Sequence, residues 1–161
     1  MIIRDETPTD HAVIRELVAA AFGQPDEADL VERLRADGDA AIALVAEDNG
    51  SVVGHILFSR MQAPFRALGL APVSVTPERQ GTGIGSRLIR AGLERAQAEG
   101  WQGVFVLGDP AYYRRFGFDP ELAEGFTSAY SGPYLMAIAL GGEMPERQGP
   151  VDYAPAFAEL G

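Results

Sequence analysis

A glycine-dense segment between two regular stretches offers the clearest chemistry in the sequence. Residues 73–75 have the pattern of a strand end, and glycines at 81, 83 and 85 follow, ahead of an amphipathic helix. Such a turn exposes backbone N–H groups at a helix N-terminus, where the helix dipole adds partial positive charge. No acidic residue lies in the first two turns of that helix. We therefore expect phosphate or pyrophosphate binding; an ordinary tight βα turn is the alternative.

Composition restricts the kind of phosphate site. All 13 basic residues are Arg, so a Walker-A lysine, a Schiff base and a kinase-type ATP lysine are excluded. A Rossmann fingerprint would need a third small residue at Ser86 and an acid closing the next strand, but Asp109 lies beyond the usual separation. The absence of Cys excludes a thiolate nucleophile, a disulfide and a Cys-built zinc site, and we expect no metal.

The elements that must position this turn follow from hydrophobic periodicity. An Asn-Gly pair at 49–50 predicts a hairpin, and Pro72 predicts an irregular stretch in the strand before the turn. The resulting order, β-α-α-β-β-β-α-β-α-β, predicts one α/β sheet that is antiparallel at first and has a later parallel crossover. We expect a single domain over residues 1–161, with a tail that packs on it. Strands are expected near 2–3, 40–46, 51–59, 67–75, 104–107 and 134–140, and helices near 8–22, 26–35 and 111–115, with a long helix from residue 84 that stops at Gly100.

The charge balance argues against two classes of partner. With 23 acids against 13 arginines the net charge is −10, which disfavours nucleic acid and anionic membrane surfaces. No apolar run approaches the roughly 18 residues of a membrane span, and residues 1–6 do not read as a signal peptide; we expect a cytoplasmic protein. The charge is uneven, because residues 79–95 hold four arginines and one acid while residues 5–38 hold nine acids and three arginines.

Two motifs resemble a known family. Gln80, Gly83 and Gly85 match the Gln/Arg-x-x-Gly-x-Gly/Ala signature of the GNAT acetyltransferases, and residues 113–118 (Tyr-Arg-Arg-Phe-Gly-Phe) match the family's Tyr-x-x-x-Gly-Phe element. The resemblance covers essentially the whole chain and is most detailed for the bacterial YhbS-like branch. Further similarity lies in residues 53–59, 107–113 and 149–157.

The resemblance implies the GNAT fold, a mixed and mostly antiparallel central sheet flanked by helices, with acetyl-CoA as cosubstrate. The pantetheine arm would pair with the backbone of Val73, Ser74 and Val75 along an edge left open by local splaying. The Ser74 side chain is not expected to be catalytic. The pyrophosphate would lie on the turn amides of Gln80, Gly81, Thr82, Gly83, Ile84, Gly85 and Ser86.

The implied reaction is N-acetyl transfer by direct attack of a neutral amine on the thioester in a ternary complex. Tyr113 matches the family tyrosine that protonates the departing thiolate, and a phenol suits that role because it stays protonated at neutral pH. The neighbouring Tyr112 is the alternative. A base is left open among His55, Glu78 and Asp109, and a water chain would also suffice.

The acceptor would be a small-molecule or peptide amine. In the family the first two helices wall the acceptor side, so the acids of residues 5–38 suggest a cationic acceptor; solvated helix faces are the alternative. A non-catalytic CoA-binding or regulatory module is the competing function. Longer acyl donors and any oligomeric state are left open by the sequence.

Overall fold

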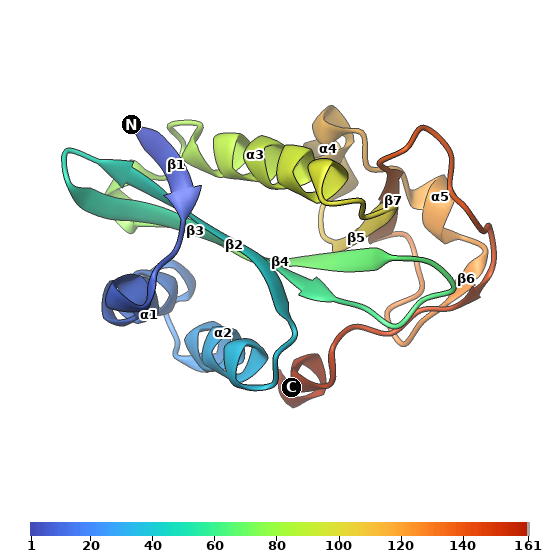
Figure 1. Ribbon diagram of the computed structural model, residues 1–161, viewed down its shortest axis with the longest axis horizontal. Coiled ribbons are helices and arrows are strands. Elements are labelled where there is room, and N and C mark those ends of the chain that lie inside the picture. Colours follow the sequence, from blue (N-terminus) through green and yellow to red (C-terminus); the bar gives the residue numbers. More distant parts are fainter. Residues whose placement is uncertain (161) are drawn as a thin grey trace.

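A six-stranded sheet runs through the middle of the molecule, with helices on both faces (Figure 1). The computed structural model describes residues 1–160. The strands of this sheet are β1 (Ile2–Asp5), β2 (Ala40–Asp48), β3 (Ser51–Arg60), β4 (Ala67–Val75), β5 (Gly103–Leu107) and β7 (Leu135–Ala139), in that spatial order. The helices are α1 (His11–Phe22), α2 (Asp26–Ala36), α3 (Ile84–Ala98), α4 (Pro110–Tyr113) and α5 (Pro120–Ala123).

The pairing confirms the predicted mixed sheet. All neighbouring strands are antiparallel except β4 and β5, which are parallel and joined through α3. The predicted set of elements was incomplete toward the C-terminus. The helix expected at 111–115 is α4 followed by a 3-10 turn over Arg114–Phe116, and the strand expected at 134–140 is not the last, because β8 (Gly149–Pro150) pairs with β6 (Phe126–Thr127). α5 was also missed.

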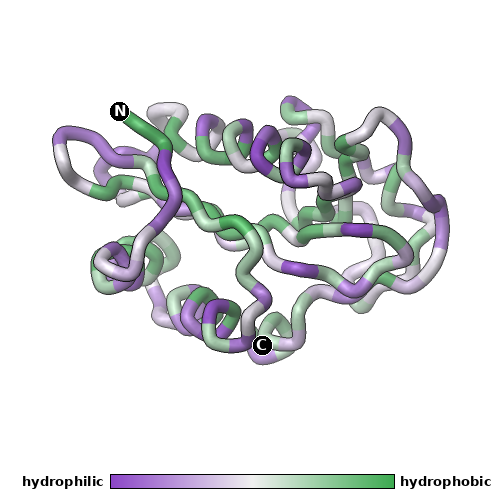
Figure 2. Tube along the Cα trace, in the orientation of Figure 1, coloured by the Kyte–Doolittle hydropathy of each residue, from purple (hydrophilic) through white to green (hydrophobic). Residues whose placement is uncertain are grey.

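Alternating side chains of the central strands fill a core on each face of the sheet. On β2, Leu44 faces the α3 side and Val45 faces α1, and both are buried, as period-two alternation requires. Figure 2 shows the apolar residues along these central strands and hydrophilic residues on the outer helix surfaces. Gly92 lies in α3 directly against the Phe58 ring, which leaves no space for a side chain at that position. Within the described residues, no helix is long and apolar enough to cross a membrane.

The tail packs on the domain as predicted. Val151 is fully buried, and the 3-10 turn over Pro155–Glu159 lies beside α2 (Figure 1). Phe157 belongs to the same buried cluster as Leu30 and Leu34 of α2. Residues more than a hundred positions apart thus form one wall of the molecule.

β4 separates from β5 halfway along its length. The two strands pair only through Ala67–Gly69 of β4, and from Leu70 to Val75 the sheet pairing of β4 is with β3 alone. The β3–β4 register shifts opposite residues 71 and 72, so the irregularity predicted from Pro72 is present. The separation leaves one backbone edge of β4 open next to the glycine turn.

Candidate functional site

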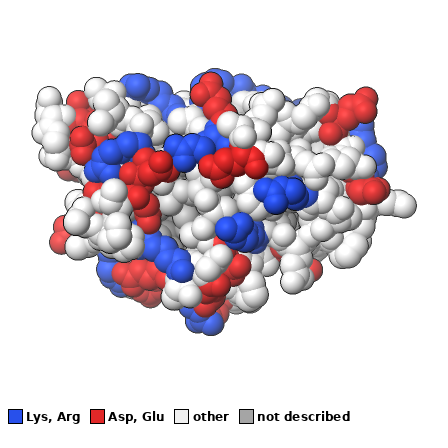
Figure 3. All heavy atoms as spheres, in the orientation of Figure 1, with Lys and Arg blue, Asp and Glu red and all other residues white. Residues whose placement is uncertain are grey.

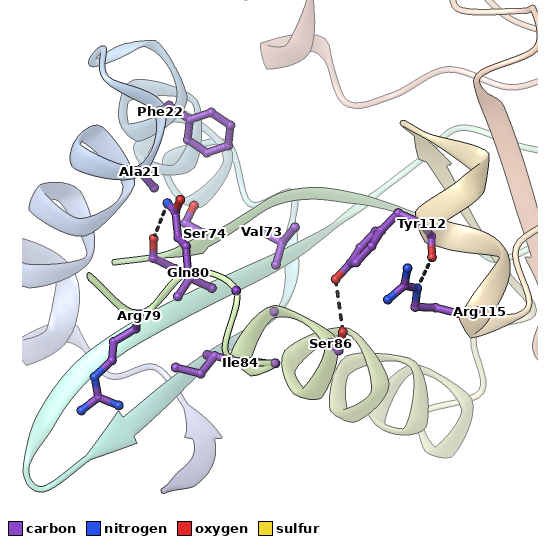
Figure 4. A pocket seen from close by; sticks show the side chains of 14 residues that line it. Ala21, Phe22, Val73, Ser74, Arg79, Gln80, Ile84, Ser86, Tyr112 and Arg115 are labelled. Carbon is purple, nitrogen blue, oxygen red and sulfur yellow. Dashed lines mark hydrogen bonds between the residues drawn. The ribbon is translucent and has the colours of Figure 1, made fainter. Parts of the chain in front are cut away.

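A cavity of about 460 Å³ lies at this open edge of β4 and extends over the glycine turn to the start of α3 (Figure 4). Residues of the end of α1, of β4, of the turn and of the α4 region line it together. The lining consists of Ala21, Phe22, Val73, Ser74, Val75, Arg79, Gln80, Gly81, Gly83, Ile84, Gly85, Ser86, Tyr112 and Arg115.

The turn has the backbone that an anion site needs. Gly81 and Gly83 have φ values of +77° and +89°, and Gly83 is the N-cap of α3. The first turn of α3 contains no acidic residue and receives no side-chain cap, so its amides face the cavity without an internal anionic partner. Thr82 is outside the lining, because its hydroxyl donates back to the Arg79 carbonyl.

The strand edge presents backbone donors and acceptors to the cavity. Thr76 N donates to Val53 O on β3, whereas the Val75 carbonyl accepts a hydrogen bond from Gln80 Nε2 at 3.1 Å. Since strand residues alternate between the two edges, Val73 and Val75 both direct their N–H and C=O groups away from β3. The structure therefore brings together the strand and turn residues that the sequence singled out.

Two arginines line the cavity. Arg79 pairs with Asp48 at 2.9 Å, and the Arg115 guanidinium lies 4.5 Å from the centroid of the Tyr112 ring. No carboxylate occurs in the lining formed by residues 1–160. The sequence analysis named Tyr112 only as the alternative to Tyr113 and did not identify Arg115 or the end of α1 as lining residues, since their proximity to the turn is a tertiary effect.

Tyr112 and Tyr113 serve different cavities. Consecutive helical residues point about 100° apart; accordingly Tyr112 faces the turn, with its hydroxyl 3.3 Å from Ser86 Oγ, while Tyr113 lines an adjoining cavity of about 320 Å³. Phe22 and Val73 line both cavities. Burial, and then the neighbouring Tyr112, raise the pKa of Tyr113, so its phenol is protonated at neutral pH.

The three candidate bases occupy unlike environments. Glu78 is exposed on the 3-10 turn after β4, and the Asp109 carboxylate accepts a hydrogen bond from Ala111 N, which makes it the N-cap of α4. His55 is fully buried, and its Nε2 lies 2.8 Å from Glu6 Oε1. None of the three lines either cavity. Asp109 and His55 thus each have a structural partner in the folded protein.

Glu6 links the N-terminal segment to the sheet. Its carboxylate accepts hydrogen bonds from His55 and from Arg35 Nε at 2.8 Å, and His11 Nε2 lies 3.2 Å away. Burial opposes ionisation, but the hydrogen bonds from His55 and Arg35 outweigh it and lower the pKa of Glu6 to about 2. This carboxylate is therefore ionised in the folded protein over the whole neutral range.

Most acids of residues 5–38 are paired with arginines. Figure 3 shows cationic and acidic side chains interleaved on the face it displays. Glu27 differs from the paired acids because it lines the cavity that contains Tyr113. The arginine-paired acids are Asp5, Glu6, Asp10, Asp29, Glu32 and Asp37.

Comparison with known proteins identifies the family. Residues 2–120 match the family model described as Acetyltransferase (GNAT) domain. The chain is 45% identical over 134 residues to the uncharacterized N-acetyltransferase YjhQ of Escherichia coli K12, a match that covers 78% of this chain and 72% of that protein. It is 39% identical over 123 residues to the uncharacterized N-acetyltransferase YhbS of the same strain, with 74% of each chain covered.

Solved structures agree over nearly the full length. The crystal structure of the E. coli YhbS protein in complex with CoA superposes with a TM-score of 0.92 at 32% identity, covering 99% of this chain and 93% of that one. A GNAT acetyltransferase of Brucella melitensis in complex with acetyl-CoA gives a TM-score of 0.83 at 42% identity, with 97% of both chains covered. The predicted fold class is confirmed, and this chain belongs to the GNAT family of N-acetyltransferases.

Proposed function

We propose that the cavity over the glycine turn binds acetyl-CoA and that this chain transfers its acetyl group to an amine. The observation that carries the proposal is the open edge of β4 leading directly into the anion-binding turn. Val73 and Val75 offer amide groups that suit the pantetheine arm, and the amides before α3 suit the pyrophosphate. The complexes of the YhbS and Brucella melitensis proteins, with CoA and acetyl-CoA respectively, support this assignment.

Side chains complete the fit to a large polyanion. Arg115 supplies positive charge at the cavity, where this sequence has no lysine, and Arg79 lies in the lining while paired with Asp48. Gly85 has no Cβ, and a Cβ built there would meet its nearest neighbours only at 3.7 Å, so backbone and ligand can approach closely at that point. Thr82 would contribute through its backbone, because its hydroxyl is bonded to Arg79.

Tyr113 is the proposed general acid. Tyr113 lines the cavity of about 320 Å³, which adjoins the cavity over the glycine turn (the donor cavity) at Val73. The raised pKa of Tyr113 keeps its hydroxyl protonated, as donation of a proton to the departing thiolate requires. The amine nitrogen forms a bond to the acetyl carbon, the carbon–sulfur bond breaks, and Tyr113 donates its hydroxyl proton to sulfur. The proton that the nitrogen loses as the amide forms passes through water, and a proton from water restores the Tyr113 phenol. Tyr112 faces Ser86 at the turn and is assigned to the donor cavity instead.

The test is calorimetric titration with acetyl-CoA, followed by measurement of CoA release with a panel of amines. We expect saturable binding, and thiol release that requires both acetyl-CoA and an amine. Binding without release for any amine would favour the non-catalytic CoA-binding module. Lack of acetyl-CoA binding would refute both functions.

A further inference from the structure

Two cavities continue from the donor site along β4. The cavity of about 320 Å³ that contains Tyr113 is followed by one of about 280 Å³ near the C-terminal tail. These two share the four lining residues Leu70, Ala71, Leu107 and Leu160. Since the first of them shares Phe22 and Val73 with the donor cavity, the three lie in succession with Tyr113 in the middle one.

The far cavity is lined by apolar and aromatic side chains. The Tyr153 ring packs against Tyr130 and Phe157, with centroid distances of 5.5 and 5.1 Å. Large apolar side chains also remain exposed at these cavities, with Leu107 at 47% and Phe22 at 43% of their maximal area. A contiguous exposed apolar surface of this kind is typical of a binding site.

A buried hydroxyl also lacks a partner here. Tyr153 Oη is buried and has no hydrogen-bond partner among the described residues, although it belongs to a residue that lines the far cavity. Leaving such a donor unpaired is unfavourable. Because Oη itself is not exposed, a ligand in this cavity would contact other atoms of Tyr153.

The charge of the lining distinguishes two kinds of ligand that would fit, an apolar amine and the acyl chain of a longer acyl-CoA. Among the described residues that line these two cavities, Glu27 is the only charged one, and it lies in the cavity that contains Tyr113. A carboxylate beside an apolar channel attracts an ammonium group and disfavours an anionic ligand. The uncharged acyl chain of a longer acyl-CoA gains nothing from it.

We infer that the acceptor is a primary amine carried on an apolar, ring-bearing body. The amine lies near Tyr113 and Glu27, and the ring occupies the cavity formed with Tyr130, Tyr153 and Phe157. This inference rests on the proposed acetyl transfer and names the substrate class of the same site. The acids of residues 5–38 suggested a cationic acceptor. The inference attributes recognition of its positive charge to one of these acids, Glu27.

The test compares amines in the CoA-release assay at fixed acetyl-CoA. 2-Phenylethylamine is the probe, and ethanolamine, spermidine and a lysine-containing peptide are the comparisons. We expect kcat/KM for 2-phenylethylamine to exceed that for ethanolamine at least about tenfold, because burial of a ring is worth that much or more. Saturation-transfer NMR measures binding of 2-phenylethylamine even where turnover is slow.

Matched variants localise the effect. Leu107→Ser should raise the KM for 2-phenylethylamine at least about threefold and leave acetyl-CoA affinity unchanged, because Leu107 is outside the donor cavity. Tyr134→Ser is the control, since Tyr134 is 60% exposed and is not among the residues that line these cavities. Glu27→Gln should weaken binding of the cationic probe and reduce its dependence on salt.

The outcomes separate the two proposals. If acetyl-CoA binds and spermidine or the peptide is the better acceptor, the ring-bearing acceptor is refuted while acetyl transfer stands. If octanoyl-CoA replaces acetyl-CoA with higher kcat/KM and Leu107→Ser abolishes that gain, the cavity holds the acyl chain and the inference is again wrong. If acetyl-CoA does not bind, both proposals are refuted.

Discussion

Replacing Gly85 by Ala should stabilise the protein and weaken its binding of acetyl-CoA. Gly85 lies in the first turn of α3 with ordinary helical backbone, and an added Cβ would meet Tyr112 Oη at 3.7 Å and Val75 Cγ2 at 3.8 Å, which are normal contacts. Gly costs about 0.5–1 kcal/mol relative to Ala in a helix. Nothing in the free protein offsets that cost, so the proposed close approach of the pyrophosphate would account for glycine at this position.

The magnitude follows from these contacts. We expect the free energy of unfolding of Gly85→Ala to rise by up to about 1 kcal/mol, which raises Tm by about 2–4 °C in a protein of this size. The same methyl group occupies the space above the backbone where the pyrophosphate is proposed to lie. We expect acetyl-CoA affinity to fall at least about tenfold, or about 1.4 kcal/mol.

Gly92→Ala in the same helix provides the matched control, because it should lower the free energy of unfolding where Gly85→Ala raises it. Its Cβ would overlap the Phe58 ring, and such overpacking costs about 1–3 kcal/mol, more than the helix gains. Urea denaturation measures stability and calorimetry measures binding in both variants. A Gly85→Ala protein that binds acetyl-CoA normally, or that unfolds at lower urea than the wild type, would refute the assignment of the phosphate site.

Three further predictions concern named side chains. Tyr113→Phe should lower kcat at least about tenfold and leave acetyl-CoA affinity nearly unchanged, because the phenol hydroxyl is needed only when the thiolate departs; stopped-assay turnover and calorimetry measure both, and unchanged kcat would remove the acid role. Glu6 has a folded-state pKa of about 2 against 4.5 in the unfolded chain, so it contributes about 3 kcal/mol that is fully present above pH 4.5 and lost as the pH falls toward 2. Glu6→Gln should therefore be less stable at pH 7 and flatten the acid limb of stability against pH; an unaltered limb would contradict the assignment. Arg115→Gln should weaken acetyl-CoA binding severalfold and reduce its salt dependence, whereas Arg60→Gln, outside the donor cavity, should do neither.

The strands and the glycine turn were predictable because their signals are local. Period-two alternation and the Asn49-Gly50 pair define β2 and β3, and the glycines at 81 and 83 mark the turn before α3, where the anion site is proposed. The short elements were missed for a physical reason. α5 has four residues and β6 has two, so each spans only about one period of its pattern and shows no repeat, and tertiary contacts hold them.

The walls of the site could not be predicted from pattern alone. Phe22 reaches the donor cavity from the end of α1, and Arg115 reaches it from beyond β5, so neither has a sequence neighbour that signals the role. His55 and Glu6 are 49 residues apart and meet only because β1 and β3 flank β2. Packing of distant segments thus forms both the cavity walls and the His55–Glu6 pair, which lies outside the cavities.

The donor cavity and the cavity that contains Tyr113, where the amine is proposed to bind, share a wall, and this has a kinetic consequence. Because Phe22 and Val73 line both, a donor bound along β4 would itself become part of the surface that the amine meets. We therefore expect ordered addition, with acetyl-CoA first, and an amine affinity that is higher in the binary complex than in the free protein. Thermodynamic linkage then requires the amine to tighten donor binding by the same factor. A wall of two side chains would thus set the sequence of events in each catalytic cycle.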